Sequence, residues 1–329
     1  MRAFVFESIG QPGKIQTDMP VLQPKSGEIL VKIHASGVNP ADLKIVEGHL
    51  APAAPAFPAI LGMDFAGIVT ALGEGVTQFS VGDEVYGCAG GVKAHAGTLA
   101  EYAAVDARLV AHKPKSLSMH QAAALPLVSI TAWEGLVDRA KTKSGDKVLI
   151  HAGAGGVGHI AIQIAKAFGA ELFTTVSTPD KQDLARKLGA TPIAYREVPV
   201  GDYVAHYTAG EGFDIVYDTV GGPVFEDAAA ATRLYGKLIS CAAWQEHNLS
   251  HVLGASLDLI GIFMLLPMIT GKNLVRHGEI LSEITQLVDA GKLAPVLDPV
   301  RFNLDDVNAA HAHLASGKAI GKIVIDVVS

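Results

Sequence analysis

A glycine-rich segment at residues 146–158, DKVLIHAGAGGVG, limits what this chain can fold into more than any other stretch. Its apolar run at 148–150 predicts a short buried strand. Three glycines follow that run with the spacing G-x-G-x-x-G: Gly153, Gly155 and Gly158. Residues 159–169 then carry apolar side chains at every fourth position and end in a glycine, which predicts a helix with a glycine C-cap. Strand, glycine turn and helix in this order predict a βαβ unit.

The turn itself predicts a binding site for the pyrophosphate of a dinucleotide. The first glycine permits a tight turn, the second lets a phosphate approach bare backbone, and the third lets the helix pack closely on the strand. Backbone N–H groups at the positive end of the helix then face the phosphates. The expected cofactor-binding residues of the turn are consecutive: Gly153, Ala154, Gly155, Gly156, Val157 and Gly158.

Length, charge and cysteine content narrow the organisation and the partners. The 329 residues exceed one ordinary core and suggest two domains. A net charge of −7 without a basic run argues against nucleic acid or an anionic membrane as the main partner. Two distant cysteines, Cys88 and Cys241, give no disulfide framework and indicate a reduced, cytoplasmic setting. The N-terminus lacks the apolar core of a signal peptide, and the longest apolar stretch, 259–270, is too short to span a bilayer.

Residues 1–122 are expected to form a β-rich domain, a small and irregular barrel. Short runs rich in Val, Ile and Phe, bounded by Gly and Pro, predict strands at 3–6, 28–35 and 65–72. The Pro/Ala-rich segment 49–58 is expected to be an extended surface loop.

Helical composition at 118–140, with Ser118 as an N-cap and Pro126 as a break, marks the crossing to a second domain. From residue 146 onward strands and helices alternate, which predicts a doubly wound parallel sheet of six strands. The candidate strands are 147–151, 171–176, 192–195, 213–218, 237–241 and 259–264. Helices are expected to begin near residues 159, 180, 201 and 223.

The C-terminal segment follows a sheet that is already complete. It is expected to contain a helix at 279–290, a longer helix at 304–316 and a last strand at 322–327, and to return to the first domain and close a cleft. The expected domains are therefore 1–122 with 268–329, for the substrate, and 123–267, for the cofactor.

The tip of the second strand bears on the choice of cofactor. NAD-binding folds place Asp or Glu there to hold the ribose hydroxyls, whereas this strand ends in Ser177. Lys181 lies just beyond and can face a 2′-phosphate, and Tyr195, at the end of the third strand, can stack beside it. Arg186 is interpreted as solvated helix surface. The missing carboxylate removes the repulsion of a phosphate, so NADPH is favoured.

No metal site is expected. Zinc sites need clustered Cys or His at set spacing, and Cys88 has no Cys within four residues. His311 and His313 are two apart on a helical stretch and face different sides. These residues, and His34 in a strand, are interpreted as surface or hydrogen-bonded side chains.

Seven blocks, in their order and spacing, resemble the medium-chain dehydrogenase/reductase superfamily, and specifically its zinc-free quinone oxidoreductase (zeta-crystallin-like) branch. The blocks lie at 38–48, 61–87, 97–106, 122–136, 151–166, 218–222 and 317–325. Zinc alcohol dehydrogenases of the superfamily carry a catalytic Cys where this chain has Pro40 and Ala41. They carry Gly-His-Glu where it has Gly62, Met63 and Asp64, and they have a four-cysteine lobe that is absent here.

The resemblance implies a GroES-like first domain, a Rossmann-type second domain and a substrate site between them. It implies that the Asn-Pro block lines this site, so the catalytic candidates are Asn39, Asp42, Lys44 and, from the helical crossing, Thr131. It also places three segments on the nicotinamide side of the cofactor, at Val220, Cys241 and Phe263.

Together these features predict an NADPH-dependent, metal-free reductase that transfers a hydride to a quinone or an α,β-unsaturated carbonyl. The donor to the acceptor oxygen is expected to be Asn39 or Lys44, and the proton is expected from solvent. Two alternatives are a zinc-free alcohol dehydrogenase and a relative that binds NADPH or RNA without catalysis. The acidic net charge argues against the RNA-binding alternative.

A homodimer is expected, because the sixth strand, 259–266, is apolar and lies at a sheet edge that must be covered. Antiparallel pairing with a second copy would cover it, and Ile262→Pro is expected to break that pairing. The alternative cover is the helix at 279–290 of the same chain.

Overall fold

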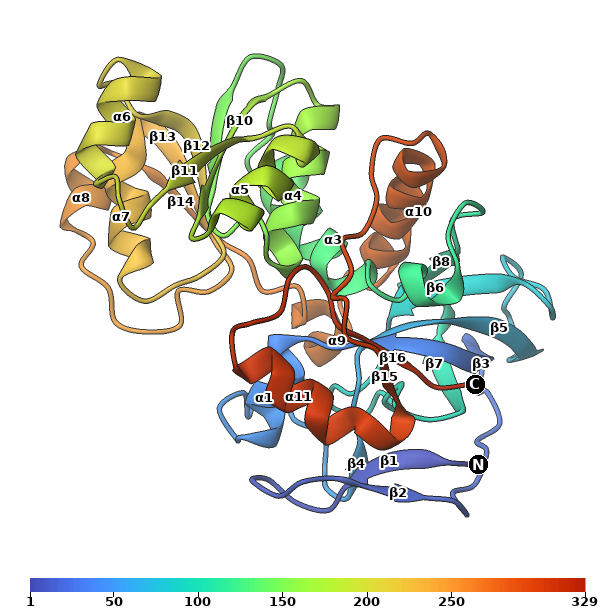
Figure 1. Ribbon diagram of the computed structural model, residues 1–329. Coiled ribbons are helices and arrows are strands. Elements are labelled where there is room, and N and C mark those ends of the chain that lie inside the picture. Colours follow the sequence, from blue (N-terminus) through green and yellow to red (C-terminus); the bar gives the residue numbers. More distant parts are fainter. Residues whose placement is uncertain (329) are drawn as a thin grey trace. The chain divides into compact units, whose positions relative to one another are not determined.

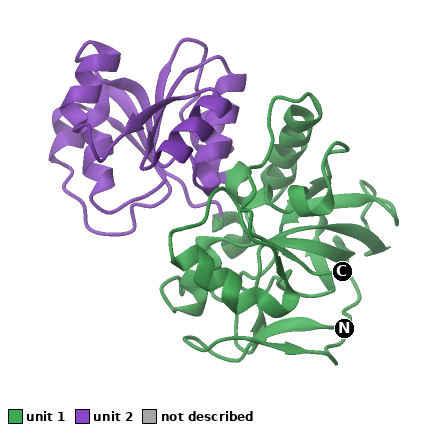
Figure 2. Cartoon of the chain, in the orientation of Figure 1, with its two compact units in different colours: residues 1–130, 265–329 green, residues 131–264 purple. Residues whose placement is uncertain are grey.

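The computed structural model describes residues 1–328, and the chain divides into two compact units (Figure 2). Unit 1 consists of Met1–Ile130 and the chain from Leu265 onward, and unit 2 is Thr131–Met264. No helix within the described residues is long and apolar enough to cross a membrane.

Unit 1 is built on two sheets (Figure 1). The smaller has the order β2-β1-β4, with the strands Ala3–Phe6 (β1), Lys14–Gln16 (β2) and Ala59–Ile60 (β4). The larger has seven strands in the order β15-β16-β3-β5-β6-β8, with β7 also paired to β3. Its strands are Glu28–Gly37 (β3), Asp64–Leu72 (β5), Glu84–Cys88 (β6), Tyr102–Asp106 (β7), Val110–His112 (β8), Phe302–Asn303 (β15) and Val324–Asp326 (β16).

Helices lie around these sheets. They are Pro40–Val46 (α1), Met119–Ala122 (α2), Leu266–Thr270 (α9), Val275–Asp289 (α10) and Val307–Ala315 (α11), with 3-10 turns at Ala107–Leu109 (η1) and Leu304–Asp306 (η3). The helix Pro126–Trp133 (α3) begins in unit 1 and ends in unit 2. Ser118 caps α2 in a capping box with Gln121, and α3 begins at Pro126, as predicted from the sequence.

The C-terminal segment joins unit 1, because β16 pairs antiparallel with β3. The prediction that its second helix is the longer one is wrong: α11 has 9 residues and α10 has 15. The helix does not start at 304, because Asn303 caps a separate 3-10 turn, η3, ahead of α11. The loop expected at 49–58 begins with turns over 49–53, which bury Leu50 and Ala53, and residues 54–58 form neither helix nor strand.

Unit 2 holds one parallel sheet of six strands in the order β11-β10-β9-β12-β13-β14. The strands are Lys147–Ile150 (β9), Glu171–Val176 (β10), Thr191–Ala194 (β11), Phe213–Asp218 (β12), Thr232–Ser240 (β13) and Asp258–Gly261 (β14). The predicted doubly wound sheet is confirmed. Its last strand ends at Gly261, earlier than predicted, and Ile262 adds one more ladder bond, to the Ser240 carbonyl.

Helices alternate with these strands (Figure 1). They are Gly156–Ala167 (α4), Pro179–Leu188 (α5), Val200–Thr208 (α6), Val224–Ala231 (α7) and Ser250–Gly254 (α8), preceded by a π-helix at Glu134–Arg139 (η2). The core between the sheet and α6–α8 combines aliphatic side chains with four buried aromatic ones, Phe173, Tyr203, Phe213 and Phe225. This packing fixes the strand ends, and so the loops that follow them.

Candidate functional site

The loops that follow the carboxyl ends of the six strands in unit 2 carry most of the proposed cofactor residues. In strand order from β9 to β14 these are Gly153, Ser177, Tyr195, Val220, Cys241 and Phe263. Carboxyl ends of parallel strands share one edge of the sheet, so the fold brings these residues to one edge. The order reverses between β9 and β12, which are neighbours, and such a switch point is where open α/β sheets bind ligands.

The glycine turn connects β9 to α4, and its glycines have different roles. A Cβ on Gly158 would lie 2.2 Å from the Ala152 carbonyl oxygen, and one on Gly153 would lie 2.1 Å from Thr174 Oγ1. Both must therefore be glycine for packing. The residue of the turn with a left-handed backbone is Ala152, with φ 53°. The tight turn therefore does not depend on Gly153, contrary to the prediction from the sequence.

Gly155 is the N-cap of α4 and leaves the helix start without a capping side chain. A Cβ there would approach only Ala152, at 3.1 Å to the carbonyl oxygen. The first backbone N–H groups of a helix have no intrahelical partner, and the space over Gly155 is open apart from Ala152. This is a cradle that a side chain would fill, and it fits a pyrophosphate.

Beyond the tip of β10, Ser177 is half-buried and Thr178 is the N-cap of α5. Lys181 stands at the third position of α5, and its backbone N–H donates to Thr178 Oγ1. Val176 and Ala194 are paired in register, so Ser177 and Tyr195 both follow directly after paired residues. Their adjacent strand ends leave a polar corner without a carboxylate at the strand tip.

One carboxylate organises the ends of β12 and β13. Asp218 is fully buried, and its Oδ1 accepts from the backbone N–H groups of Val220 and Gly221, at 2.9 and 2.8 Å. Its Oδ2 accepts from the Ser240 hydroxyl at 2.6 Å. Cys241, next along the chain, is half-buried.

Two further buried groups of unit 2 lie near this edge. Burial lowers the pKa of His151, the residue before the turn, to about 4, so its imidazole is neutral at pH 7. Thr131 is 4 % exposed, and its carbonyl accepts from the Tyr217 hydroxyl at 2.8 Å, which ties α3 to β12.

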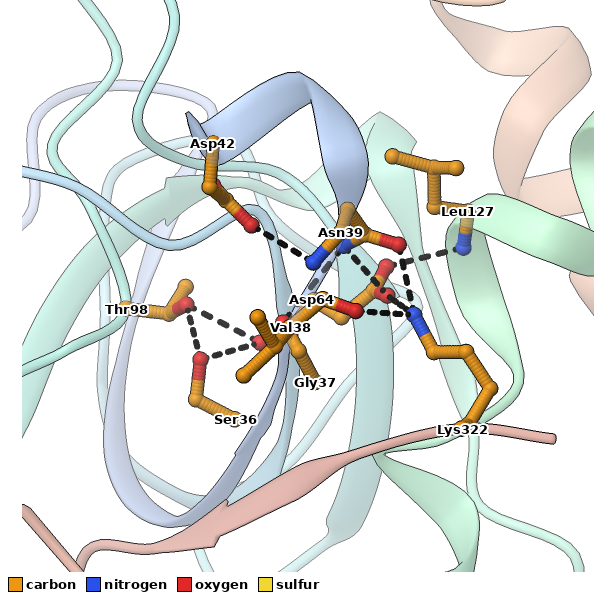
Figure 3. A network of polar contacts seen from close by, with 9 residues as sticks. All are labelled: Ser36, Gly37, Val38, Asn39, Asp42, Asp64, Thr98, Leu127 and Lys322. Atoms are coloured by element: carbon orange, nitrogen blue, oxygen red, sulfur yellow. Dashed lines mark hydrogen bonds and ion pairs between the residues drawn. The ribbon is translucent and has the colours of Figure 1, made fainter. Parts of the chain in front are cut away.

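In unit 1, Asn39 lies in a buried polar network rather than in an open turn (Figure 3). Its side-chain Nδ2 donates to Asp64 Oδ2 at 2.9 Å, and its Oδ1 accepts from the Lys322 ammonium. Lys322 also donates to the Val38 carbonyl at 2.9 Å and to Asp64 Oδ2 at 3.2 Å. The other oxygen of Asp64 accepts from the backbone N–H of Leu127, at 2.8 Å.

Asp42 belongs to the same region, at the third position of α1. Its Oδ2 accepts from the Asn39 backbone N–H at 2.9 Å in a capping box. Burial first, and then the nearby Asp64 carboxylate, raise the pKa of Asp42 to about 7. Burial also raises the pKa of the Cys88 thiol, so Cys88 is a neutral group rather than a thiolate. Lys44, one turn along α1 from the N-cap, is exposed.

Sequence reasoning missed Asp64, Lys322 and Asp218 as organising groups. Asp218 lies in the block 218–222 that carries part of the family resemblance, and an acid directly ahead of Thr-Val-Gly-Gly could have been recognised there. Across residues 1–328, no group of three or more His, Cys, Asp or Glu side chains is placed to hold a metal ion.

A β-rich unit joined to a doubly wound sheet with a phosphate cradle at its switch point defines a dinucleotide-dependent oxidoreductase. Two family models match the chain. The alcohol dehydrogenase GroES-like domain covers residues 25–115, and the zinc-binding dehydrogenase domain covers residues 188–325.

Individual relatives match nearly end to end. A 2-methylene-furan-3-one reductase of Solanum lycopersicum is 35% identical over 99% of this chain and 79% of its own length. An alcohol dehydrogenase superfamily protein from Novosphingobium aromaticivorans is 46% identical, with a TM-score of 0.95 over 100% of both chains. The Escherichia coli quinone oxidoreductase complexed with NADPH is 28% identical, with a TM-score of 0.87 over 99% of this chain and 100% of that one. The protein belongs to the medium-chain dehydrogenase/reductase superfamily, as an oxidoreductase that uses a nicotinamide cofactor.

Proposed function

We propose that the protein is an NADPH-dependent reductase that works without a metal and passes a hydride to an enone or a quinone. The observation that carries this proposal is the edge of the unit 2 sheet, where a bare helix start adjoins a strand tip without a carboxylate. The named relatives, a furanone reductase and a quinone oxidoreductase with NADPH, support the same reaction. We assign residues 131–264 to cofactor binding and the rest of the chain to the substrate.

The residues divide the work of binding and orientation. The turn at Gly155 would hold the pyrophosphate, while Ser177, Lys181 and Tyr195 would hold the 2′-phosphate. Val220, Cys241 and Phe263 would flank the nicotinamide. Bound there, the nicotinamide supplies a hydride, and the chain's role is to align the acceptor and exclude water.

In unit 1 we assign Asn39 a positioning role, because its amide and carbonyl groups are already engaged by Asp64 and Lys322. Lys44 is exposed on α1 and is the proposed donor to the developing oxyanion of the acceptor. The carbon next to the one that receives the hydride also needs a proton. Solvent can supply that proton, so no buried acid of the chain is required for this step.

NADPH preference is tested at Lys181. We expect NADPH to bind more tightly than NADH. Lys181→Ala should weaken the binding of NADPH by roughly 1–2 kcal/mol and leave the binding of NADH unchanged. Arg186→Ala is the matched control, because Arg186 on the same helix already pairs with Asp183 at 2.7 Å. Equal affinity of the parent protein for the two cofactors would overturn the preference.

The reaction is tested by following NADPH oxidation with a panel of enones and quinones before and after dialysis against a strong chelator. We expect turnover with both classes, unchanged by the chelator. Oxidation of simple alcohols with NADP⁺ would favour the alcohol dehydrogenase alternative, and tight NADPH binding without turnover would favour a binding role. One zinc per chain with chelator-sensitive turnover would contradict the metal-free mechanism.

We also propose a cytoplasmic homodimer that engages neither nucleic acid nor membrane. Neither Cys88 nor Cys241 forms a disulfide, as expected in a reducing compartment. The edge strand β14 exposes Leu259, at 44 %, and the neighbouring segment exposes Leu234 and Tyr235, at 63 % and 76 %. A second copy paired along β14 would cover this edge.

A further inference from the structure

The loop between β13 and α8 presents a large aromatic side chain to solvent. Trp244 is 55 % exposed, although tryptophan is usually well covered. The Phe263 ring supports it edge-on, with 4.9 Å between ring centroids and 80° between planes. Val220, at the end of the neighbouring strand β12, is 49 % exposed. Trp244 and Phe263, called here the aromatic wall, follow the ends of β13 and β14, next to the loop after β12 that carries Val220.

The backbone that presents Trp244 is held firmly. The Ser240 hydroxyl, itself bound to Asp218, accepts from the N–H groups of Ala242 and Ala243, at 3.1 and 3.0 Å. The backbone N–H of Trp244 then donates to the Ala242 carbonyl at 2.9 Å. The loop after β12 closes against this turn, since a Cβ on Gly221 would lie 2.3 Å from the Ala242 oxygen.

The far end of the same loop is anchored as well. His247 Nδ1 lies 3.1 Å from Glu226 Oε1 on α7, and its ring packs on that of Phe225, with 4.3 Å between ring centroids and a tilt of 33°. The Asn248 N–H donates to the same Glu226 carboxylate at 3.2 Å. A loop tied at both ends that still exposes a tryptophan is organised to present that side chain.

The position of the aromatic wall indicates what it meets. The switch point lies between β9 and β12, and the proposed 2′-phosphate residues follow β10 and β11 on one side of it. A dinucleotide bound across a switch point places its second half on the other side, along the ends of β12 to β14. The wall therefore lies on the half of the edge where the hydride is exchanged.

We propose that Trp244, backed by Phe263, sets substrate preference by packing against the aromatic or extended conjugated part of the hydride acceptor. The inference rests on the proposed reductase function and narrows its substrates to aryl-conjugated enones and quinones over small aliphatic ones. Flat rings gain from stacked or edge-to-face contact with an indole beyond what area burial alone supplies. An aliphatic enone of a few carbons is too small to use this surface.

The test compares benzylideneacetone with methyl vinyl ketone in the parent protein, Trp244→Ala and Trp244→Phe. We expect Trp244→Ala to raise the KM for benzylideneacetone about tenfold, the size of a good aromatic contact. The KM for methyl vinyl ketone, kcat and the affinity for NADPH should change less than about twofold. Trp244→Phe should restore most of the preference. Leu249→Ala, at a 42 % exposed leucine of the same loop, is the control and should behave as the parent.

Binding without turnover gives an independent readout. In the presence of NADP⁺, which cannot donate a hydride, benzylideneacetone should quench the fluorescence of the exposed Trp244, and Trp244→Phe should lose this quenching because Trp133 is buried. An unchanged ratio of the KM values for the two enones in Trp244→Ala contradicts the inference, whether or not that variant sediments as a smaller species. Failure of the parent protein to reduce either enone would instead count against the proposed function.

Discussion

The Lys322 ammonium lies 3.2 Å from Asp64 Oδ2, and both side chains are almost fully buried, at 3 % and 0 % exposed. The pair connects the C-terminal segment to β5, and through Asn39 and Leu127 it reaches the starts of α1 and α3 (Figure 3). A buried ion pair gains little over apolar packing, because desolvation offsets the attraction. We infer that this one is kept for the position of the groups it holds.

The unfolding free energy should therefore fall more when one partner of the pair is removed than when both are removed. Lys322→Met leaves the Asp64 carboxylate buried without its cation, and we expect a loss of about 3–5 kcal/mol in unfolding free energy. The double variant Lys322→Met/Asp64→Leu removes both charges at similar volume, so urea unfolding should show most of that stability regained.

Activity should not return with stability. In the double variant Asn39 loses its contacts to both side chains, so we expect kcat for enone reduction to fall while NADPH affinity is kept. A double variant with parental stability and parental kcat would show that the pair is only a structural device.

Asp42 predicts a pH dependence of stability. Its pKa is about 7 in the folded chain and 3.8 as the ordinary value, so the folded chain keeps a proton that the unfolded chain releases. The unfolding free energy should thus fall as pH rises from about 4 to about 7, by up to about 4 kcal/mol at 1.4 kcal/mol per pKa unit, and level off above. The measurement is urea unfolding across this range.

Asp42→Asn is the control for that series. Its amide oxygen can still accept from the Asn39 N–H, but it does not titrate. The variant should lack this fall in stability. Parallel stability curves for the parent and the variant would assign the pH dependence to other groups.

The glycine turn separates cofactor binding from folding. Gly155 has φ −85°, which any residue adopts, and a Cβ there meets the Ala152 oxygen at 3.1 Å, against 2.2 Å for Gly158. Gly155→Val should therefore still fold, with only a small loss of melting temperature, while NADPH binding collapses. Gly158→Ala forces a Cβ against the Ala152 carbonyl and should lower the melting temperature. Thermal melts and NADPH titrations of both variants decide this. Parental NADPH affinity in Gly155→Val would place the phosphates elsewhere.

The proposed dimer is tested at the outer edge of β14. The Ile262 N–H donates inward to Ser240, so Ile262→Pro, the variant first expected to test pairing, would instead break a bond within the sheet. N–H groups alternate between the two sides of a strand, so that of Gly261 points outward. We expect Gly261→Pro to dissociate or aggregate in sedimentation at micromolar concentration, and Gly261→Ala to stay dimeric because its Cβ meets open space. A soluble, active parent monomer would rule the pairing out.

Local patterns predicted the parts of the fold that depend on neighbouring residues. The glycine turn, the Ser118 cap and the six strands of unit 2 could all be predicted, because each is determined by a few neighbouring residues. The lengths of α10 and α11 could not be. The stretch predicted as one helix from residue 304 begins with the separate 3-10 turn η3, so α11 starts only at Val307.

Contacts between distant segments were beyond sequence reasoning. Lys322 and Asp64 are 258 residues apart, and nothing local marks either as a partner of Asn39. The exposure of Trp244 likewise depends on how Asp218 and Ser240 shape two loops from different strands.

The proposed reaction transfers a hydride from NADPH to carbon without a metal, and isotope tracing follows that hydride itself. The chelator-treated protein is given benzylideneacetone and NADPH deuterated at the transferable position, and the product is analysed by NMR and mass spectrometry. We expect one deuterium on the β-carbon of a saturated ketone, with the proton on the neighbouring carbon drawn from solvent. Deuterium on the carbinol carbon of an allylic alcohol, or loss of turnover on metal removal, would contradict it.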